Sequence, residues 1–324
     1  MTAKLARAWL CAALALFAFQ ASAQSYPSGP INLVIPLAPG DATDTAARVM
    51  ADKLSKELNV PIVPVNKPGA GGALGTQFVV QAPKDGYTIT LTNNASLIYR
   101  SILQPQIASY NALTDLTPLA LGMRSPSILV VGGEQPFKSF GAMVSYAKKN
   151  PGKVRIGTAG QGSVGDFCVQ TINSLTGAGI VMVPFKGASP AVTAMRGGHI
   201  EGVVLALGTM VPLLKQGVVR GLVISTKWQD LPEIPTLAEL GYRQPLFDVW
   251  TGFFAPAGVP PEVTRKLVPA LARVVQSPEV AARLKPLGIA ADYSPPEKLV
   301  AEIRDEHARV LAIAQKEGLI KGGK

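Results

Sequence analysis

The stretch Ile31–Glu57 limits the possible folds most, because it has the pattern of a strand, a tight turn and a helix in direct succession. Five apolar residues within Ile31–Leu37 predict a short buried strand, and Pro39–Gly40 ends it. Apolar residues then recur at helical spacing over Ala47–Leu58. Such a helix points its positive N-terminus at the strand end. The unit is therefore either a plain connection or a main-chain site for an anion.

Two later glycine-rich loops hold the same position between a strand and a helix. Gly69–Thr76 follows the apolar run Asn59–Val65, and Gly160–Asp166 follows a strand predicted at Val154–Gly157. Strands that alternate with helices predict an α/β fold with mostly parallel sheets, whose ligands bind at the carboxyl ends of the strands. Three loops of this kind favour a site for a small anion over plain connections.

The first 23 residues have the order of a secretory signal: Lys4 and Arg7, an apolar run, and then Ala21–Ala23. We expect cleavage after Ala23. The character of the chain changes near residues 123–127, so we assign residues 24–123 with 246–324 to lobe 1 and residues 124–245 to lobe 2. Cys168 is then the one remaining cysteine. We expect Cys168 to be a small buried residue in the hydrophobic core and to form no internal disulfide.

The charge balance favours anionic partners. The chain has 31 Lys and Arg residues against 21 Asp and Glu residues, a formal net charge of +10. These basic residues are scattered, and aromatic residues make up 6% of the chain, which argues against a nucleic-acid surface. Small anionic solutes fit this pattern better, and we expect no nucleic-acid partner.

A dinucleotide-binding reading has one motif in its favour, because Gly160, Gly162 and Gly165 match G-x-G-x-x-G after a strand. The motif also needs an acid at the end of the next strand to bind the ribose. That strand ends at Val183–Lys186, which holds no acid. We therefore expect no cofactor.

Catalytic and metal chemistry also find little support. Ser163 lacks the glycine two residues earlier that a nucleophile elbow needs. His199 and His307 are expected on the surface, and the pair Asp305/Glu306 reads as solvated helix surface. No cluster of residues has the spacing of a zinc site. We expect no metal and no enzyme activity. The alternative is a secreted hydrolase that uses Ser163 as its nucleophile, but the sequence offers no general base for it.

The loops also carry a family resemblance that covers nearly all of the chain after the signal. The chain resembles the Bug family of periplasmic solute-binding proteins, which serve tripartite tricarboxylate transporters. The matching stretches are PLAPGDATDTAARVMADKL at 36–54, VNKPGAGGALGT at 65–76, KDGYTITLTNNAS at 84–96, GTAGQGSVGDF at 157–167, VPFKGASPAVTAMRGGHIEGVV at 183–204, LPEIPTLAELGY at 231–242 and WTGFFAPAGVP at 250–259.

The resemblance implies a two-lobe, type II-like Venus-flytrap fold in the periplasm, with a ligand cleft between the lobes. It implies a monomer that captures a small organic acid, either a di- or tricarboxylate, an aromatic acid or an amino acid, for the membrane subunits of such a transporter. A sensor that presents the bound solute to a signalling partner is the alternative within this class.

Carried over by position, the resemblance places ligand contacts on three groups of residues. They are Leu37, Ala38, Pro39, Gly40, Gly71 and Gly72 in the first two loops, Asn93 and Ser96 at a strand end, and Thr158, Ser163 and Phe185 in the other lobe. Asp41 and Asp166 depart from the family pattern. Either they indicate a ligand that carries an amine or amide beside its carboxylate, or one less acidic than a di- or tricarboxylate, or both are helix caps that point away from the cleft.

Overall fold

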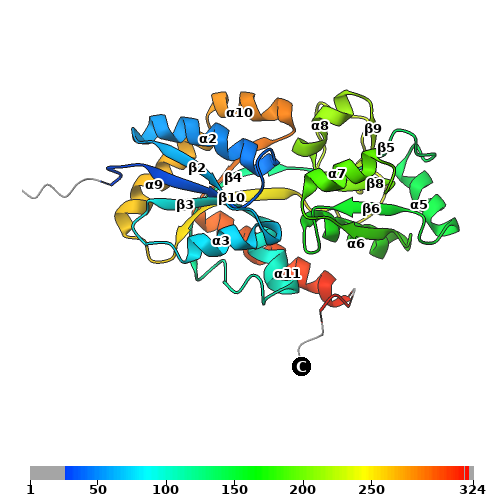
Figure 1. Ribbon diagram of the computed structural model, residues 1–324, viewed down its shortest axis with the longest axis horizontal. Coiled ribbons are helices and arrows are strands. Elements are labelled where there is room, and N and C mark those ends of the chain that lie inside the picture. The colour runs from blue at the N-terminus through cyan, green and yellow to red at the C-terminus, as the bar shows by residue number, and fades with distance from the viewer. Residues whose placement is uncertain (1–25, 317, 321–324) are drawn as a thin grey trace, which may run out of the picture.

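The computed structural model describes residues 26–316 and 318–320 of the 324-residue chain, so the predicted signal peptide at residues 1–23 lies outside the described residues. Two β-sheets lie side by side, and each is flanked by helices, which divides the molecule into two lobes (Figure 1). This arrangement confirms the predicted two-lobe α/β fold.

The sheet of the first lobe has six strands in the order β11-β4-β10-β3-β1-β2. These strands are β1 Ile31–Ile35, β2 Ile62–Asn66, β3 Thr88–Asn93, β4 Leu116–Ser125, β10 Val249–Pro256 and β11 Ala290–Ser294. The helices of this lobe are α2 Ala42–Leu58, α3 Ala73–Val80, α9 Pro261–Val275, α10 Pro278–Leu284 and α11 Pro296–Lys316. Short helical segments are η1 Ala70–Gly72, η2 Ala95–Tyr99, α4 Arg100–Leu103 and η3 Lys285–Leu287.

The sheet of the second lobe has five strands in the order β7-β6-β8-β5-β9. They are β5 Ser127–Gly132, β6 Arg155–Thr158, β7 Val181–Pro184, β8 Gly202–Ala206 and β9 Val219–Ile224. Its helices are α5 Phe140–Lys149, α6 Val164–Thr176, α7 Ala188–Arg196 and α8 Leu207–Lys215. Among the residues that the structure describes, no helix is long and apolar enough to cross a bilayer.

The first strand and helix form as the sequence predicts. Ile31, Leu33 and Ile35 in β1 are fully buried, because β1 lies between the parallel strands β2 and β3 and helices α2 and α9 pack against these side chains. Helix α2 turns Met50 and Leu54 into the same core. The helices therefore cover the sheet while the loops at the strand ends are left for the cleft.

Both sheets are mixed, so the prediction of mostly parallel sheets is wrong in part. Strand β10 runs antiparallel to β3 and β4, and β5 runs antiparallel to β8 and β9. The chain crosses from the first lobe to the second in β4–β5 and returns in β10. The crossing strands β5 and β10 run antiparallel to their neighbours in the two sheets. Strands β4 and β11 were not predicted from the sequence.

The crossing joins the lobes at Ser125. Strand β4 ends there, β5 begins at Ser127, and the return segment runs from Ile224 to Val249. The predicted lobe boundary at residues 123/124 falls inside β4, and the boundary at 245/246 falls just before β10. The division into residues 24–123 with 246–324 and residues 124–245 stays a prediction.

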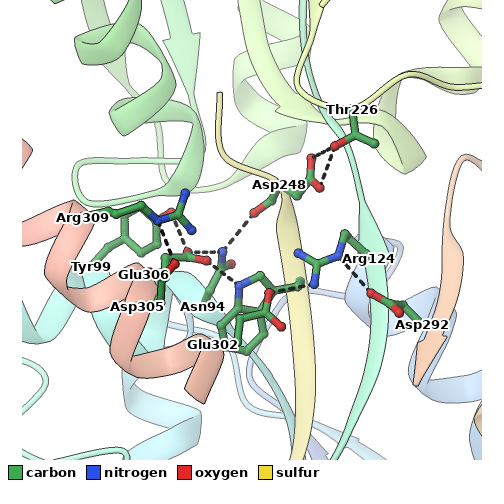
Figure 2. A network of polar contacts seen from close by, with 11 residues as sticks. Asn94, Tyr99, Arg124, Thr226, Asp248, Asp292, Glu302, Asp305, Glu306 and Arg309 are labelled. Carbon is green, nitrogen blue, oxygen red and sulfur yellow. Dashed lines mark hydrogen bonds and ion pairs between the residues drawn. The ribbon is translucent and has the colours of Figure 1, made fainter. Parts of the chain in front are cut away.

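A polar network beside the crossing corrects one further prediction. Glu306 on α11 is 3% exposed and not part of a solvated surface. Its carboxylate accepts hydrogen bonds from Asn94 Nδ2 at 2.7 Å, Tyr99 Oη at 2.8 Å and Trp250 Nε1 at 2.7 Å (Figure 2). The neighbouring Asp305 is the exposed acid, and it pairs with Arg309.

Candidate functional site

A cavity of about 740 Å³ opens between loops of the two lobes. From the first lobe it is lined by the segment after β1, the segment after β2 and the end of β3; from the second lobe it is lined by the segments after β6, β7 and β8. Loops that follow strands of both sheets thus meet at one place. This is where ligands bind in α/β proteins.

The loop after β1 offers main-chain donors. The N–H group of Ala38 has no hydrogen-bond partner within the described residues, and Ala38 lines the cavity. The N–H group of Gly40 donates to Asp44 Oδ2 at 2.9 Å. Asp41 caps α2, since its Oδ1 accepts from Thr43 N at 2.8 Å.

The loop after β6 repeats this capping arrangement in the second lobe. Ser163 Oγ accepts from Asp166 N at 3.2 Å, and Asp166 Oδ2 accepts from Gly162 N at 2.8 Å. The N–H group of Gln161 has no partner in the described part of the chain. A Cβ at Gly165 would stand 2.4 Å from the carbonyl oxygen of Val204, so only glycine lets α6 begin against the end of β8.

Most of the predicted ligand contacts line this one cavity. They are Leu37, Ala38, Pro39, Gly40, Asp41, Gly71, Asn93, Ser163 and Phe185. The structure thus brings together residues that lie up to about 150 positions apart in the chain. Their role in ligand binding stays a prediction.

The structure places four predicted residues behind the lining. Gly72 packs against the Ser96 side chain, and the Ser96 hydroxyl is fully buried with Thr76 and Thr92. The Thr158 hydroxyl bonds to the main chain of Gly160. The Asp166 side chain, which is 3% exposed, accepts a hydrogen bond from Gly162 N. The Ser96, Thr158 and Asp166 side chains thus support the loops, and none of the four residues lines the cavity.

Sequence reasoning missed Arg100, which also lines the cavity. This arginine is 6% exposed and follows the π-helical turn η2 at the end of β3. Burial lowers its pKa from the ordinary value, while the nearby Asp166 carboxylate opposes that shift. The signal in the sequence is one basic residue between Leu97–Tyr99 and Ile102–Leu103, where an apolar residue is the norm.

Two more charged side chains belong to the lining. Lys186 lies exposed at the second lobe's edge of the cavity, and Asp41 lies half-buried at the first lobe's edge. Burial raises the pKa of Asp41 above its ordinary value, and the hydrogen bond from Thr43 N opposes this shift. The cavity therefore holds two cationic groups and one carboxyl group, which suits an anionic guest.

The geometry gives little basis for catalysis or metal binding. The Ser163 hydroxyl caps α6, and neither His199 nor His307 lines the cavity. Within the described residues, no three His, Cys, Asp or Glu side chains come together as metal ligands. Cys168 is fully buried, as predicted, and burial raises its pKa to about 12.

Comparisons with known proteins agree with this geometry. The family model described as "Tripartite tricarboxylate transporter family receptor" matches residues 46–319. Protein BugT from Bordetella pertussis is 32% identical over 321 residues, which are 98% of this chain and 98% of the relative.

Solved structures of similar proteins carry acids. MatC from Rhodopseudomonas palustris with bound malate is 30% identical, covers 90% of this chain and 100% of its own, and superposes with a TM-score of 0.82. R. palustris Rpa4515 with adipate is 28% identical over 90% of this chain and 98% of its own, with a TM-score of 0.85. The chain therefore belongs to the receptor family of the tripartite tricarboxylate transporters, the Bug family that its loop motifs indicated.

Proposed function

We propose that this protein captures a small carboxylate-bearing solute in the cavity between its lobes and delivers it unchanged to membrane subunits of a tripartite tricarboxylate-type transporter. The observation that carries the proposal is the cavity itself, because glycine-rich loops from both lobes line it. The malate and adipate bound by MatC and Rpa4515 support an acid as the guest.

The proposed contacts are mainly main-chain groups. Ala38 and Gln161 line the cavity from opposite lobes, and their N–H groups have no partner within the described residues, so we expect a carboxylate between them to receive donors from both sides. Asn93 and Phe185 add a polar and an aromatic wall. Lobe closure around the acid excludes water and strengthens each of these hydrogen bonds.

The same proposal includes the route of the protein. The chain is exported to the periplasm as a monomer, and cleavage after Ala23 removes the signal. Mass spectrometry of the periplasmic protein tests the cleavage site, since a mature chain that begins at Gln24 is expected.

A thermal-shift screen of the mature protein tests the function. The panel is malate, citrate, adipate, benzoate and aspartate, each against its uncharged amide as the matched control. A ligand at about 100 times its Kd stabilises the folded state by about 2.7 kcal/mol, which raises Tm by about 5 °C for a chain of this size. We expect at least one acid to produce such a shift while its amide does not.

An acid that binds tightly and co-purifies with the protein would mask the rise in Tm. The same preparation is therefore denatured, refolded and screened again. The released small molecules are identified by mass spectrometry. A protein that releases no acid and responds to none in either screen contradicts the proposed function.

A further inference from the structure

We propose that the guanidinium of Arg100 binds an anionic group of the solute and so selects acids with a second carboxylate. This inference rests on the proposed function and extends it from one carboxylate held by main-chain groups to a diacid. Three observations carry it: the free guanidinium donors, the glycine loops beside them, and the lack of a carboxylate at bonding distance among the described residues.

The guanidinium has donors to spare. Its Nη1 donates to Gln104 Oε1 at 2.6 Å. Its Nε is buried and has no hydrogen-bond partner within residues 26–316 and 318–320, and its Nη2 makes no hydrogen bond there either. A buried donor without a partner is unfavourable, so the site is complete only when something else supplies acceptors.

No carboxylate of the described residues forms an ion pair with this cation. Every other strongly buried ionic group has close partners: Asp44 pairs with Arg48, and Glu306 receives three hydrogen bonds. Asp166 is near enough to influence Arg100, yet its oxygens are bonded to Gly162 N and Gln170 Nε2. A buried cation without a partner is costly, and this cost is offset when an anion enters the cavity.

Glycines from both lobes surround the free donors. A Cβ at Gly71 would stand 2.6 Å from Nη2 and 2.8 Å from Nε, and a Cβ at Gly160 would stand 3.5 Å from Nη2. Any side chain at residue 71 would thus occupy the Nε–Nη2 edge of the guanidinium. The main chain of Gly71 lies against this edge, so an acid that bridges both atoms requires the loop around Gly71 to move away from the guanidinium.

The chemistry of this edge is that of a carboxylate receptor. Nε–H and Nη2–H are parallel donors, and arginine uses such pairs to bind both oxygens of one carboxylate. The main-chain donors at Ala38 and Gln161 are left for the first carboxylate, so a second acidic group is the natural partner of Arg100.

The test compares each diacid of the panel with its monomethyl ester by isothermal titration calorimetry. The variants are Arg100→Met, which keeps length without charge, and Arg100→Lys, which keeps charge without the planar donor pair. Lys186→Met is the matched control, because it removes the other cation of the cavity. The circular dichroism spectrum and Tm of each variant verify that it is folded.

We expect Arg100→Met to weaken diacid binding about 10- to 100-fold and to leave the monoester within about threefold. Arg100→Lys recovers part of the loss, and Lys186→Met changes diacid and monoester alike. If Arg100→Met weakens both ligands equally, or neither, Arg100 supports the loops only and the inference is overturned while the proposed function stands. A wild-type protein that binds no acid overturns the proposed function itself.

Discussion

At the scale of single residues, Asp41 combines a capping role with a place in the cavity lining. Its Oδ1 caps α2, and the side chain also lines the cavity. Asp166, in the first turn of α6 in the second lobe, is buried and accepts a hydrogen bond from Gly162 N. Of these two acids, Asp41 alone lines the cavity.

Asparagine at this position separates the two roles. Asp41→Asn retains a good N-cap, so the free energy of unfolding should change by less than about 0.5 kcal/mol. Removing the negative charge should strengthen binding of plain diacids such as adipate about three- to tenfold and weaken binding of aspartate. Calorimetric titration of both acids checks this; unchanged Kd values for both would leave Asp41 as a cap alone.

At the scale of elements, helix α11 docks on the first lobe through a buried acid. Glu306 receives hydrogen bonds from η2 and β10, and Arg124 on β4 reaches Glu302 of the same helix at 2.7 Å (Figure 2). The same Arg124 contacts Asp292 on β11 at 2.9 Å. The C-terminal helix is thus fixed to strands β4 and β10 by charged groups as well as by its apolar face, and Arg124 links the same site to β11.

Glu306→Ala should lower the free energy of unfolding by about 3 kcal/mol, since three buried donors lose their acceptor. Glu306→Gln should cost about 1–2 kcal/mol, because the amide keeps one acceptor but turns a donor toward a donor. Urea unfolding measures both. Asp305→Asn is the control, because Asp305 is exposed and should change stability by less than about 0.5 kcal/mol.

The same acid predicts a pH dependence. Burial raises the pKa of Glu306 above its ordinary value of 4.5, although hydrogen bonds from Trp250, Tyr99 and Asn94 oppose the shift. A carboxyl with a raised folded-state pKa contributes stability below its unfolded pKa and loses it as pH rises through the folded pKa. Glu306→Gln should therefore be more destabilising at pH 4.5 than at pH 8; equal losses at both pH values would contradict this.

Most elements of the fold were predictable because their residues follow local rules. The run Ile31–Ile35 and the spacing in α2 are examples. Strands β4 and β11 were missed, since Pro118 interrupts one and Asp292 lies inside the other. Both become strands because β10 and Arg124 hold them in place, and such tertiary contacts leave no local pattern.

The cavity lining was predictable where glycine-rich loops carry it and unpredictable where one side chain does. Ala38 and Gly71 lie in recognisable loops. Arg100 lies after an apolar run, and the π-helical turn Ala95–Tyr99 that brings it to the cavity has no sequence signature. Glu306 was predicted to lie on a solvated surface because its hydrogen-bond partners are more than 50 residues away in the sequence.

At the scale of the whole molecule, the lobes meet at a few buried contacts beside the crossing strands. Ser125 at the end of β4 is fully buried. Its hydroxyl donates to Gly288 O of the first lobe at 2.9 Å and accepts from Gly208 N of the second lobe at 3.2 Å. Tyr99 and Phe167 pack edge to face across the same region, with ring centroids 4.7 Å apart. Buried contacts thus join the lobes beside the crossing strands, while loops of both lobes line the cavity.

Removing the Ser125 hydroxyl should therefore lower the stability of the fold without changing the ligand preference of the protein. Ser125→Ala leaves Gly208 N and Gly288 O without that partner, which should lower the free energy of unfolding by about 1–2 kcal/mol in a urea titration. Thr114→Ala, at an exposed hydroxyl, is the control and should change it by less than about 0.5 kcal/mol. Because Ser125 does not line the cavity, the rise in Tm that an acid causes should be the same in Ser125→Ala as in the wild type. A smaller rise would mean that the Ser125 hydrogen bonds favour the closed arrangement of the lobes, and that the hinge takes part in the affinity.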